Sequence, residues 1–265
     1  MTFAEATAVS KVGEGRYTGE IHAGWDIMEI ANGGYLMALA GRAMTDASDG
    51  RHLVSLTGHF MNPGRAGPAE IEVEHLKTGR RYTTSRAVLT SGGKALITVT
   101  GSLAEPAATG TTPTLLTGSP PSLPDPGDCV KAASSEPSPF PPPLVDQIDL
   151  RVHPDDAGLV RGEPTGQALF RGWFRLLDRE PVDELAVILA TDAFMPAIFN
   201  SDHPMTWTPT LDLTVHIRNR GPHAWLACKF QTRFVTGGFL EEDGEIWDER
   251  GNLVALSRQL AVVGR

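Results

Sequence analysis

The chain has 265 residues and a formal net charge of −9, with 23 Lys and Arg residues against 32 Asp and Glu residues. Such a length fits one large domain or two of ordinary size, and a hydrophobic fraction of 41% is enough to build a core. The acidic balance gives no electrostatic footprint for nucleic acid and no polybasic patch for an anionic membrane. We therefore expect a globular protein that binds neither nucleic acid nor a membrane.

Signals of export and of structural metal binding are missing from the sequence. The first residues have neither the basic segment nor the apolar run of a secretory signal, and no uncharged apolar stretch of about 18 residues follows. Two cysteines without CxxC spacing, Cys129 and Cys228, are too few for a structural zinc site. These features predict a cytoplasmic protein.

A helix followed by antiparallel strands is predicted for the first part of the chain. Residues 31–48 form a helical pattern that Asn32 and two glycines can open, with Leu36 and Leu39 at helical spacing. The alternation in residues 70–74 is typical of a half-buried strand. The strand patterns after the helix cover residues 52–62, 69–79, 81–92 and 94–104.

The middle of the chain has a different composition. Prolines, serines, threonines and glycines dominate from Glu105 to Pro143. Because proline fixes φ and removes a hydrogen-bond donor, we expect no regular structure in this stretch. We interpret it as a long linker, which divides the chain into an N-terminal unit (1–104), the linker (105–145) and a C-terminal unit (146–265).

The C-terminal unit repeats the order of elements seen in the first. Residues 181–199 are predicted to form a helix, with Pro181 suited to its first turn and Asp183 and Glu184 suited to the positive end of its dipole. The helix is apolar on nearly every side, so other structure should wrap it. The strand patterns that follow cover residues 209–219, 223–235, 238–251 and 252–263.

A weak internal repeat supports two copies of one unit. Residues 55–64 and 212–221 match at five of ten positions with an offset of 157 residues. The same offset, within one residue, aligns Gly93 with Gly251 in two predicted hairpin turns and superposes the two helices. A helix followed by antiparallel strands, present twice, indicates an α+β fold built from two similar units.

Asp192 is the most informative candidate functional residue. It lies in the most apolar part of the predicted second helix, where a carboxylate is costly to bury unless it is paired or hydrogen-bonded. It is either a carboxylate at a gap in the packing or a general base in a closed pocket. Pro196 cannot donate to the Asp192 carbonyl four residues before it, so we expect the helix to bend there.

Four further residues each allow a structural and a functional interpretation. Gly33 and Gly34 either punctuate a helix start or offer backbone N–H groups to a substrate oxyanion. Thr210 begins a strand, where threonine is common, and Gln259 lies among apolar residues of the last strand, where it needs a partner if buried. The sequence carries no nucleotide-binding, serine-hydrolase or metalloprotease motif.

At these residues the chain resembles the type II acyl-CoA thioesterases. The segments ANGGYLMALA and 59–103 carry a Gly-Gly helix start, an aromatic residue before x-x-Pro-Gly, then E-x-L-x-x-G-R-x-(Y/F)-(T/S)-x-R and G-K-x-ϕ. The resemblance continues from about Phe170 to the C-terminus. It implies a double hotdog fold, in which two tandem hotdog units each wrap a long helix with an antiparallel β-sheet.

The resemblance also implies a site and an activity. In that family an Asp, a Thr or Ser, and a Gln together hold and activate water, and the matching residues here are Asp192 in TDAFMP, Thr210 in TLD and Gln259 in GNLVALSRQ. Gly33 and Gly34 match the Gly-Gly pair on the oxyanion side. The implied reaction is hydrolysis of acyl-CoA to free fatty acid and CoA, as part of lipid metabolism and without a metal ion or other cofactor.

Two other functions stay open for this sequence. One is a double-hotdog hydratase or dehydratase of enoyl or 3-hydroxyacyl thioesters, although such enzymes usually need a paired Asp and His and the nearest histidine to Asp192 is His203. The other is an acyl-CoA binding protein without turnover. Because double hotdogs commonly pair through their sheet edges, we also expect a homo-oligomer, a dimer of double hotdogs.

Overall fold

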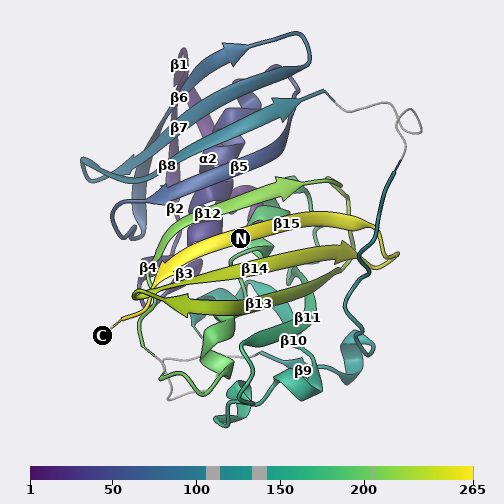
Figure 1. Ribbon diagram of the computed structural model, residues 1–265. Coiled ribbons are helices and arrows are strands. Elements are labelled where there is room, and N and C mark those ends of the chain that lie inside the picture. The colour runs from purple at the N-terminus through teal and green to yellow at the C-terminus, as the bar shows by residue number, and fades with distance from the viewer. Residues whose placement is uncertain (106–113, 133–141, 205, 265) are drawn as a thin grey trace.

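The N-terminal part of the chain contributes one central helix and one half of the main sheet (Figure 1). The computed structural model describes residues 1–105, 114–132, 142–204 and 206–264. The central helix is α2 (Gly33–Asp46), and a short helix α1 (Phe3–Ala6) precedes it. The strands of this part are β1 (Val9–Gly13), β2 (Arg16–Ile21), β3 (Asp26–Ile27), β4 (Ile30–Ala31), β5 (His52–Phe60), β6 (Gly67–Thr78), β7 (Tyr82–Ser91) and β8 (Lys94–Ala104).

The C-terminal part contributes a shorter central helix and the other half of the sheet. The helix is α3 (Glu184–Ala190). The strands are β9 (Val130–Lys131), β10 (Ile148–Val152), β11 (Leu169–Leu176), β12 (Thr210–Ile217), β13 (Leu226–Thr236), β14 (Phe239–Asp248) and β15 (Leu253–Val262). Short 3₁₀ turns are η1 (Pro126–Asp128), η2 (Pro143–Asp146), η3 (Pro154–Asp156), η4 (Leu159–Arg161) and η5 (Ala197–Asn200).

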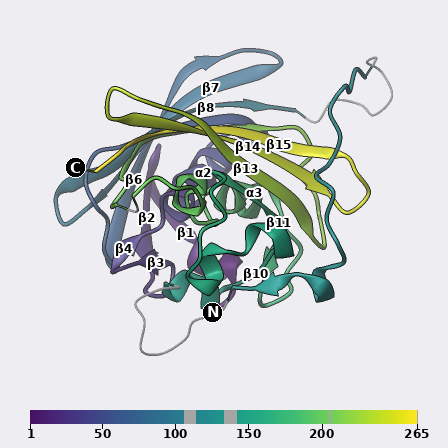
Figure 2. The ribbon, with the colours of Figure 1, turned by 60° about the horizontal axis from the view of Figure 1, so that its bottom comes forward.

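Within the described residues, thirteen strands form one continuous antiparallel sheet. Their order is β1-β2-β6-β7-β8-β5-β12-β15-β14-β13-β11-β10-β9, while β3 and β4 form a separate ribbon. Figure 2 shows the curved sheet enclosing α2 and α3. This arrangement confirms the predicted α+β double hotdog fold, and all eight strands predicted after the two helices are present.

The two halves of the sheet join at β5 and β12, and the join has approximate two-fold symmetry. Thr57 is paired with Thr214, its own equivalent 157 residues later, and the two hydroxyl oxygens are 3.0 Å apart. The pair Leu56–Val215 becomes the pair Leu213–Gly58 under the same relation. An interface in which equivalent residues exchange places in this way is isologous, as between the subunits of a symmetric dimer.

The central helices are antiparallel and approach closely at two glycines. Asn32 caps α2, since its Oδ1 accepts the Tyr35 N–H at 2.9 Å. A Cβ atom on Gly34 would lie 3.0 Å from the carbonyl oxygen of Ile188, and one on Gly41 would lie 3.1 Å from the Leu185 side chain. The absence of side chains at these glycines therefore lets the helices meet. Among the described residues no helix is long and apolar enough to span a membrane.

The second helix is much shorter than the predicted span 181–199. It ends at Ala190, and residues 192–196 form a turn before η5. The Thr191 hydroxyl donates to the Ile188 carbonyl at 2.7 Å, and the Asp192 N–H donates to the Leu189 carbonyl at 3.0 Å, so the last turn tightens. Pro196 further disfavours helical backbone just before it. Asp192 consequently lies beyond the helix, and the expected bend is a helix end.

The expectation of an irregular linker over 105–145 is wrong for part of that range. Residues 106–113 and 133–141 lie outside the described residues. Between them β9 pairs with β10, and η1 and η2 place prolines in their first turns, where a missing N–H group costs nothing. The division into units 1–104 and 146–265 stays a proposal, with β9 packed against the second unit.

Candidate active site

Asp192 lies where the turn after α3 meets the N-terminus of α2. Its carboxylate Oδ2 accepts the Gly34 N–H and the Asn32 Nδ2, both at 2.9 Å. Asn32 Nδ2 also donates to the Asp192 carbonyl oxygen at 2.7 Å. Among the described residues no hydrogen bond reaches Oδ1. One carboxylate oxygen is therefore fixed by two donors, and the other is left as an acceptor.

The surroundings of Asp192 make it a stronger base than an ordinary aspartate. Burial raises its pKa from 3.8 to about 6, against the opposing effect of the Gly34 and Gly33 N–H groups and the Asn32 side chain. No cation is bonded to the carboxylate among the described residues. A base with a pKa near the working pH is ionised and still takes up a proton readily.

Gly33 and Gly34 begin α2, as predicted, but their N–H groups are directed at a protein group. Gly34 donates to Asp192 Oδ2, and a Cβ atom on Gly33 would lie 2.9 Å from the same oxygen and 2.7 Å from the Phe60 ring. Only glycine fits at this contact. The Gly34 N–H is not free in this structure, so an oxyanion role for Gly33 and Gly34 stays a prediction that requires this donor to change partner.

The structure brings Thr210 and Gln259 into direct contact. Gln259 Nε2 donates to Thr210 Oγ1 at 2.5 Å, which joins β15 to the start of β12. The register of the two strands shifts between Thr210 and Asp212, and such a bulge re-aims a side chain. Gln259 is paired with the buried residue Leu213, so both point toward the helices. The predicted hydrogen-bond partner of Gln259 is thus Thr210.

Two residues that were not predicted as site residues complete the arrangement. Asn32 was expected to open the helix, and it also fixes Asp192. Glu242 on β14 is paired with Gln259 across the sheet, and the charge of Asp192 acts on its carboxyl group. Glu242 is therefore a neighbour of Gln259 that also interacts electrostatically with Asp192. Asp192 shares no hydrogen bond with Thr210 or Gln259 among the described residues. No cluster of three metal-ligating side chains occurs among these residues either.

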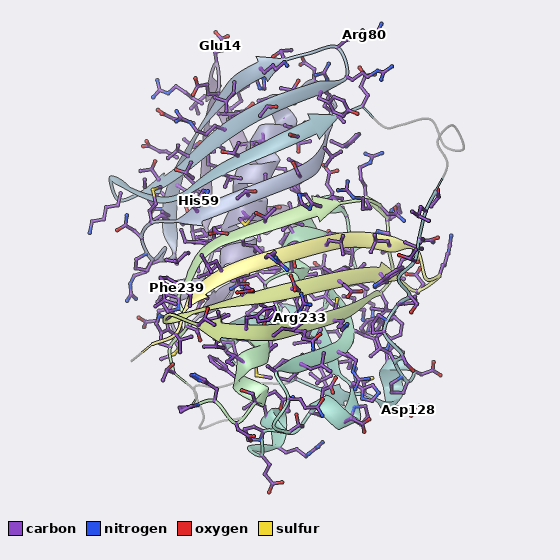
Figure 3. The ribbon with its side chains drawn as sticks, in the orientation of Figure 1. Glu14, His59, Arg80, Asp128, Arg233 and Phe239 are labelled. Carbon is purple, nitrogen blue, oxygen red and sulfur yellow. The ribbon has the colours of Figure 1, made fainter. Side chains whose placement is uncertain are left out.

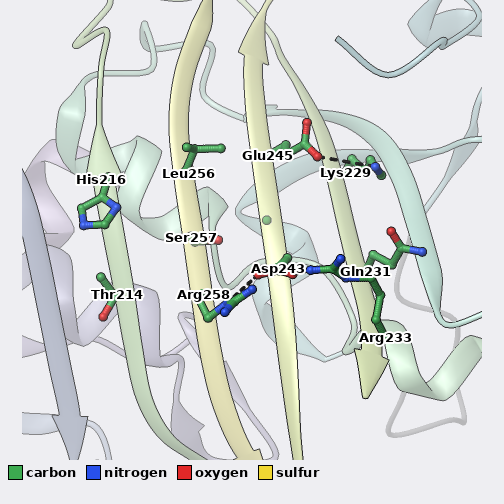
Figure 4. Close-up of a pocket in the computed structure, with 11 residues that line it drawn as sticks. Thr214, His216, Lys229, Gln231, Arg233, Asp243, Glu245, Leu256, Ser257 and Arg258 are labelled. Carbon is green, nitrogen blue, oxygen red and sulfur yellow. Dashed lines mark hydrogen bonds and ion pairs between the residues drawn. The ribbon is translucent and has the colours of Figure 1, made fainter. Parts of the chain in front are cut away.

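The hollow drawn in Figure 4 lies on the opposite, outer face of the sheet and is not lined by Asp192, Thr210 or Gln259. Asp243 alternates with Glu242 on β14 and points outward, where it binds Arg233 at 2.6 Å and Arg258 at 2.7 Å. His216 also lines this hollow, and His59 and Arg233 are seen on the same face in Figure 3. These residues are separated from the Asp192 side by the sheet itself, and they provide controls for it.

Comparison with known proteins places both parts of the chain in one family. Residues 21–104 match the model of the acyl-CoA thioesterase N-terminal domain, and residues 126–263 match that of the acyl-CoA thioesterase C-terminal domain. An uncharacterised protein of Mycobacterium tuberculosis is 26% identical over an alignment of 277 positions, which covers 93% of this chain and 90% of the relative.

Solved structures give the same result. A candidate thioesterase II from Thermobifida fusca has a TM-score of 0.86 and 34% identity, and the match covers 100% of this chain and 98% of that one. A hot dog fold protein of unknown function from Alicyclobacillus acidocaldarius has a TM-score of 0.84 at 22% identity, with 99% and 98% covered, and so supports the fold alone. With both domain models matched and the whole length aligned, this chain belongs to the acyl-CoA thioesterase family.

Proposed function

We propose that the protein hydrolyses acyl-CoA to a free carboxylic acid and CoA, with Asp192 as the general base and Thr210 and Gln259 positioning the attacking water. The observation that carries the proposal is the asymmetric environment of the Asp192 carboxylate. Two donors, Gly34 N–H and Asn32 Nδ2, fix Oδ2, whereas Oδ1 is left as an acceptor. A carboxylate held in one orientation by its second oxygen is suited to take a proton from water.

The Thr210–Gln259 pair supplies the remaining polar groups. With Gln259 Nε2 bonded to Thr210 Oγ1, the hydroxyl hydrogen and the amide oxygen of the pair stay available to water. A water that donates one hydrogen to Asp192 and one to the Gln259 amide oxygen, and accepts the Thr210 hydroxyl, has one lone pair left. These three hydrogen bonds would fix the direction of that lone pair for attack on the thioester carbon. Such fixed orientation lowers the entropic cost of attack.

The chemical steps balance without any further reactant. Water oxygen bonds to the thioester carbonyl carbon while one water proton moves to Asp192 Oδ1, and the carbonyl oxygen becomes an anion. Collapse of this tetrahedral species re-forms the carbonyl and breaks the carbon–sulfur bond. The proton on Asp192 then passes to the CoA thiolate, which leaves free thiol, free acid and an ionised Asp192.

Thiol release from acyl-CoAs, followed with a dye reagent, tests the proposal directly. Wild type should release CoA from at least one chain length between acetyl and palmitoyl, and Asp192→Asn should lose about a hundredfold or more in rate. Burial raises the pKa of both Cys129 and Cys228, so the protein's own thiols should contribute little background. The pH of the assay should lie above about 6, where Asp192 is ionised.

Asp243→Asn is the matched control for this experiment. Asp243 has the same chemistry as Asp192, lies next to Glu242 in sequence, and points to the opposite face of the sheet. Its variant should keep wild-type turnover. Binding of acyl-CoA without thiol release would reject the hydrolase proposal and favour a binding protein, and loss of enoyl-CoA absorbance without thiol release would favour a hydratase.

The carrier and the assembly are extensions of this proposal. The family fits CoA thioesters, and the predicted dimer of double hotdogs is tested by light scattering of the purified protein. The sheet ends at β1 and at the two-residue strand β9, so a dimer through the sheet edges would form at one of these strands.

A further inference from the structure

A buried carboxyl group beside the proposed site has no part in the mechanism above. Glu242 is 8% exposed and points inward from β14, on the same face as the buried residues Leu240 and Ile246. Its cross-strand neighbours are Gln259 on β15 and Thr232 on β13. The Thr232 hydroxyl is itself buried without a hydrogen-bond partner among the described residues. Burying a carboxyl group in such a position costs free energy, which suggests that the group has a role.

Glu242 makes a hydrogen bond to the segment that carries Asp192. Its Oε2 accepts the backbone N–H of Ala197 at 2.5 Å. Ala197 is the first residue of η5 and lies five residues after Asp192, at the far end of the turn. Asn32 and Gly34 hold the near end of this turn through Asp192 itself. Glu242 therefore completes a clamp on the segment that carries the proposed base.

The charges around Glu242 are negative. Within the described parts of the chain the ionised groups that act on it are Asp192 and Asp243, and Asp243 is directed outward, where Arg233 and Arg258 bind it. Those two arginines lie on the outer face as well, Gln259 and Thr232 are neutral, and η5 has no ionisable residue. Burial, with the charge of Asp192 added to it, raises the pKa of Glu242 to about 7. Among the described residues the Asp192 carboxylate accepts two donors and the Glu242 carboxyl group accepts one, so Glu242 is the member of the pair favoured to keep its proton when Asp192 is ionised.

We propose that Glu242 is a positioning residue for Asp192, and that it serves the reaction in its neutral form. The carboxyl group holds Ala197 and with it the turn that carries Asp192. When Glu242 ionises, a second negative charge enters the site in which the thioester oxygen must become an anion, and this charge raises the energy of that transition state. The inference rests on the proposed hydrolysis and adds to it an upper limit in pH.

Two variants separate the clamp from the charge. Glu242→Gln keeps an oxygen that accepts the Ala197 N–H and is neutral at every pH. It should stay within about threefold of wild type at its optimum and keep its kcat above pH 7, where wild type declines. Glu242→Met fills the same space but accepts no N–H donor. Its kcat should fall by about tenfold or more at every pH, with KM changed less, because Asp192 loses its position.

Glu184 provides a matched control. Burial also raises its pKa to about 7, but it lies in the first turn of α3, at the end away from Asp192. Glu184→Gln should leave the pH profile of kcat unchanged. If the Glu242→Gln profile declines with wild type above pH 7, or if Glu242→Met keeps full kcat, the role assigned to Glu242 is refuted.

A second measurement does not depend on turnover. Infrared absorption of protonated carboxyl groups, recorded from about pH 5 to 9, should contain contributions from both Glu184 and Glu242 in wild type, and Glu242→Gln should lack the second band. Asp192→Asn should move the midpoint of that band to lower pH, because the neighbouring charge is gone. Identical spectra for wild type and Glu242→Gln would overturn the inference even if the protein hydrolyses acyl-CoA. A protein with the expected band and no thiol release would instead refute the proposed hydrolysis.

Discussion

Replacing Asp192 by Asn should make the protein more stable while it abolishes the proposed activity. Burial raises the pKa of Asp192 from 3.8 to about 6, so at neutral pH the fold holds an ionised group that would be better solvated in the unfolded chain. A carboxyl group with a raised folded pKa contributes most to stability at low pH. That contribution is lost as the pH rises from about 4 to about 6, because the native state binds more protons than the unfolded state in this range.

The size of the effect follows from the two pKa values. Each pH unit between them corresponds to about 1.4 kcal/mol, so the ionised Asp192 costs up to about 3 kcal/mol at pH 7. Asparagine removes the charge and keeps an oxygen for the Gly34 N–H, but its own amide hydrogens then need partners. We therefore expect the free energy of unfolding at pH 7 to rise by about 1–3 kcal/mol.

Urea unfolding of wild type and Asp192→Asn, measured between about pH 4 and pH 8, gives this difference directly. The two proteins should have similar unfolding free energies at the acid end, and the variant should gain steadily up to about pH 6. The pH dependence of the difference between the two proteins is more informative than the unfolding free energy of either one. Glu242 and Glu184, whose pKa values are also raised, lower the stability of both proteins over a similar pH range.

Asp243→Asn should change the unfolding free energy at pH 7 in the opposite direction. Hydrogen bonds and charge from Arg258 and Arg233 hold the pKa of Asp243 below its usual value, so its contribution is present at neutral pH and disappears as the pH falls. Its variant should be less stable than wild type at pH 7 and equal to it in acid. If Asp192→Asn is as destabilising at pH 7 as Asp243→Asn, the carboxylate at position 192 is stabilised by its surroundings and the argument fails.

Two further predictions concern the contacts around the site. Thr210→Val and Gln259→Met should each lower kcat by about ten- to a hundredfold with little loss of stability, and the double variant should lose much less than the product, since both residues hold one water. Independent, multiplicative effects would rule out a shared water. Gly34→Ala should lower the unfolding free energy by about 1–3 kcal/mol, because the new Cβ atom would lie 3.0 Å from the Ile188 carbonyl oxygen and from the Asp192 Cβ. Gly127 has open space around it, so Gly127→Ala should leave the stability unchanged. Equal stability of the two alanine variants would show that α2 and α3 can move apart.

Local pattern was enough to predict the eight strands that follow the two helices, but β1, β2, β10 and β11 were not predicted. It also failed where backbone hydrogen bonds compete. Strands β5 to β8 and β12 to β15 alternate clearly enough to be predicted from sequence. The end of α3 could not be predicted from periodicity, because apolar residues continue to Phe199 at helical spacing. The helix ends earlier because the Thr191 hydroxyl bonds back to Ile188 and the Asp192 side chain takes the Gly34 N–H of another helix. That second contact is tertiary, so the local sequence does not contain it.

The residues around Asp192 differ in how visible they are in the sequence. Glu242 had a usable signal, since Leu240, Glu242, Gly244 and Ile246 alternate on β14 and place a carboxyl group on an otherwise apolar face. The sequence carries no signal for Asn32 as a site residue, only one for its role as the cap of the helix. Its side-chain amide is directed at Asp192, 160 residues away, and only the packing of α2 against α3 brings them together.

The two-fold relation between the halves explains why the proposed chemistry has one site per chain. The 157-residue offset holds for the paired strands but not for the helices, because α2 ends six residues before β5 and α3 ends twenty residues before β12. Asp192 follows α3 and contacts the start of α2, so its counterpart follows α2, where Ser48 is buried and donates its hydroxyl to the Met44 carbonyl at 2.7 Å. The counterpart of Thr210 in the paired strands is Leu53, which is fully buried, so the symmetric position lacks the hydroxyl of the proposed pair. The base nonetheless depends on the first half, because Asn32 and Gly34 fix its carboxylate. We infer that the N-terminal half serves the C-terminal half as a rigid support, so that neither half alone would hold Asp192 in place.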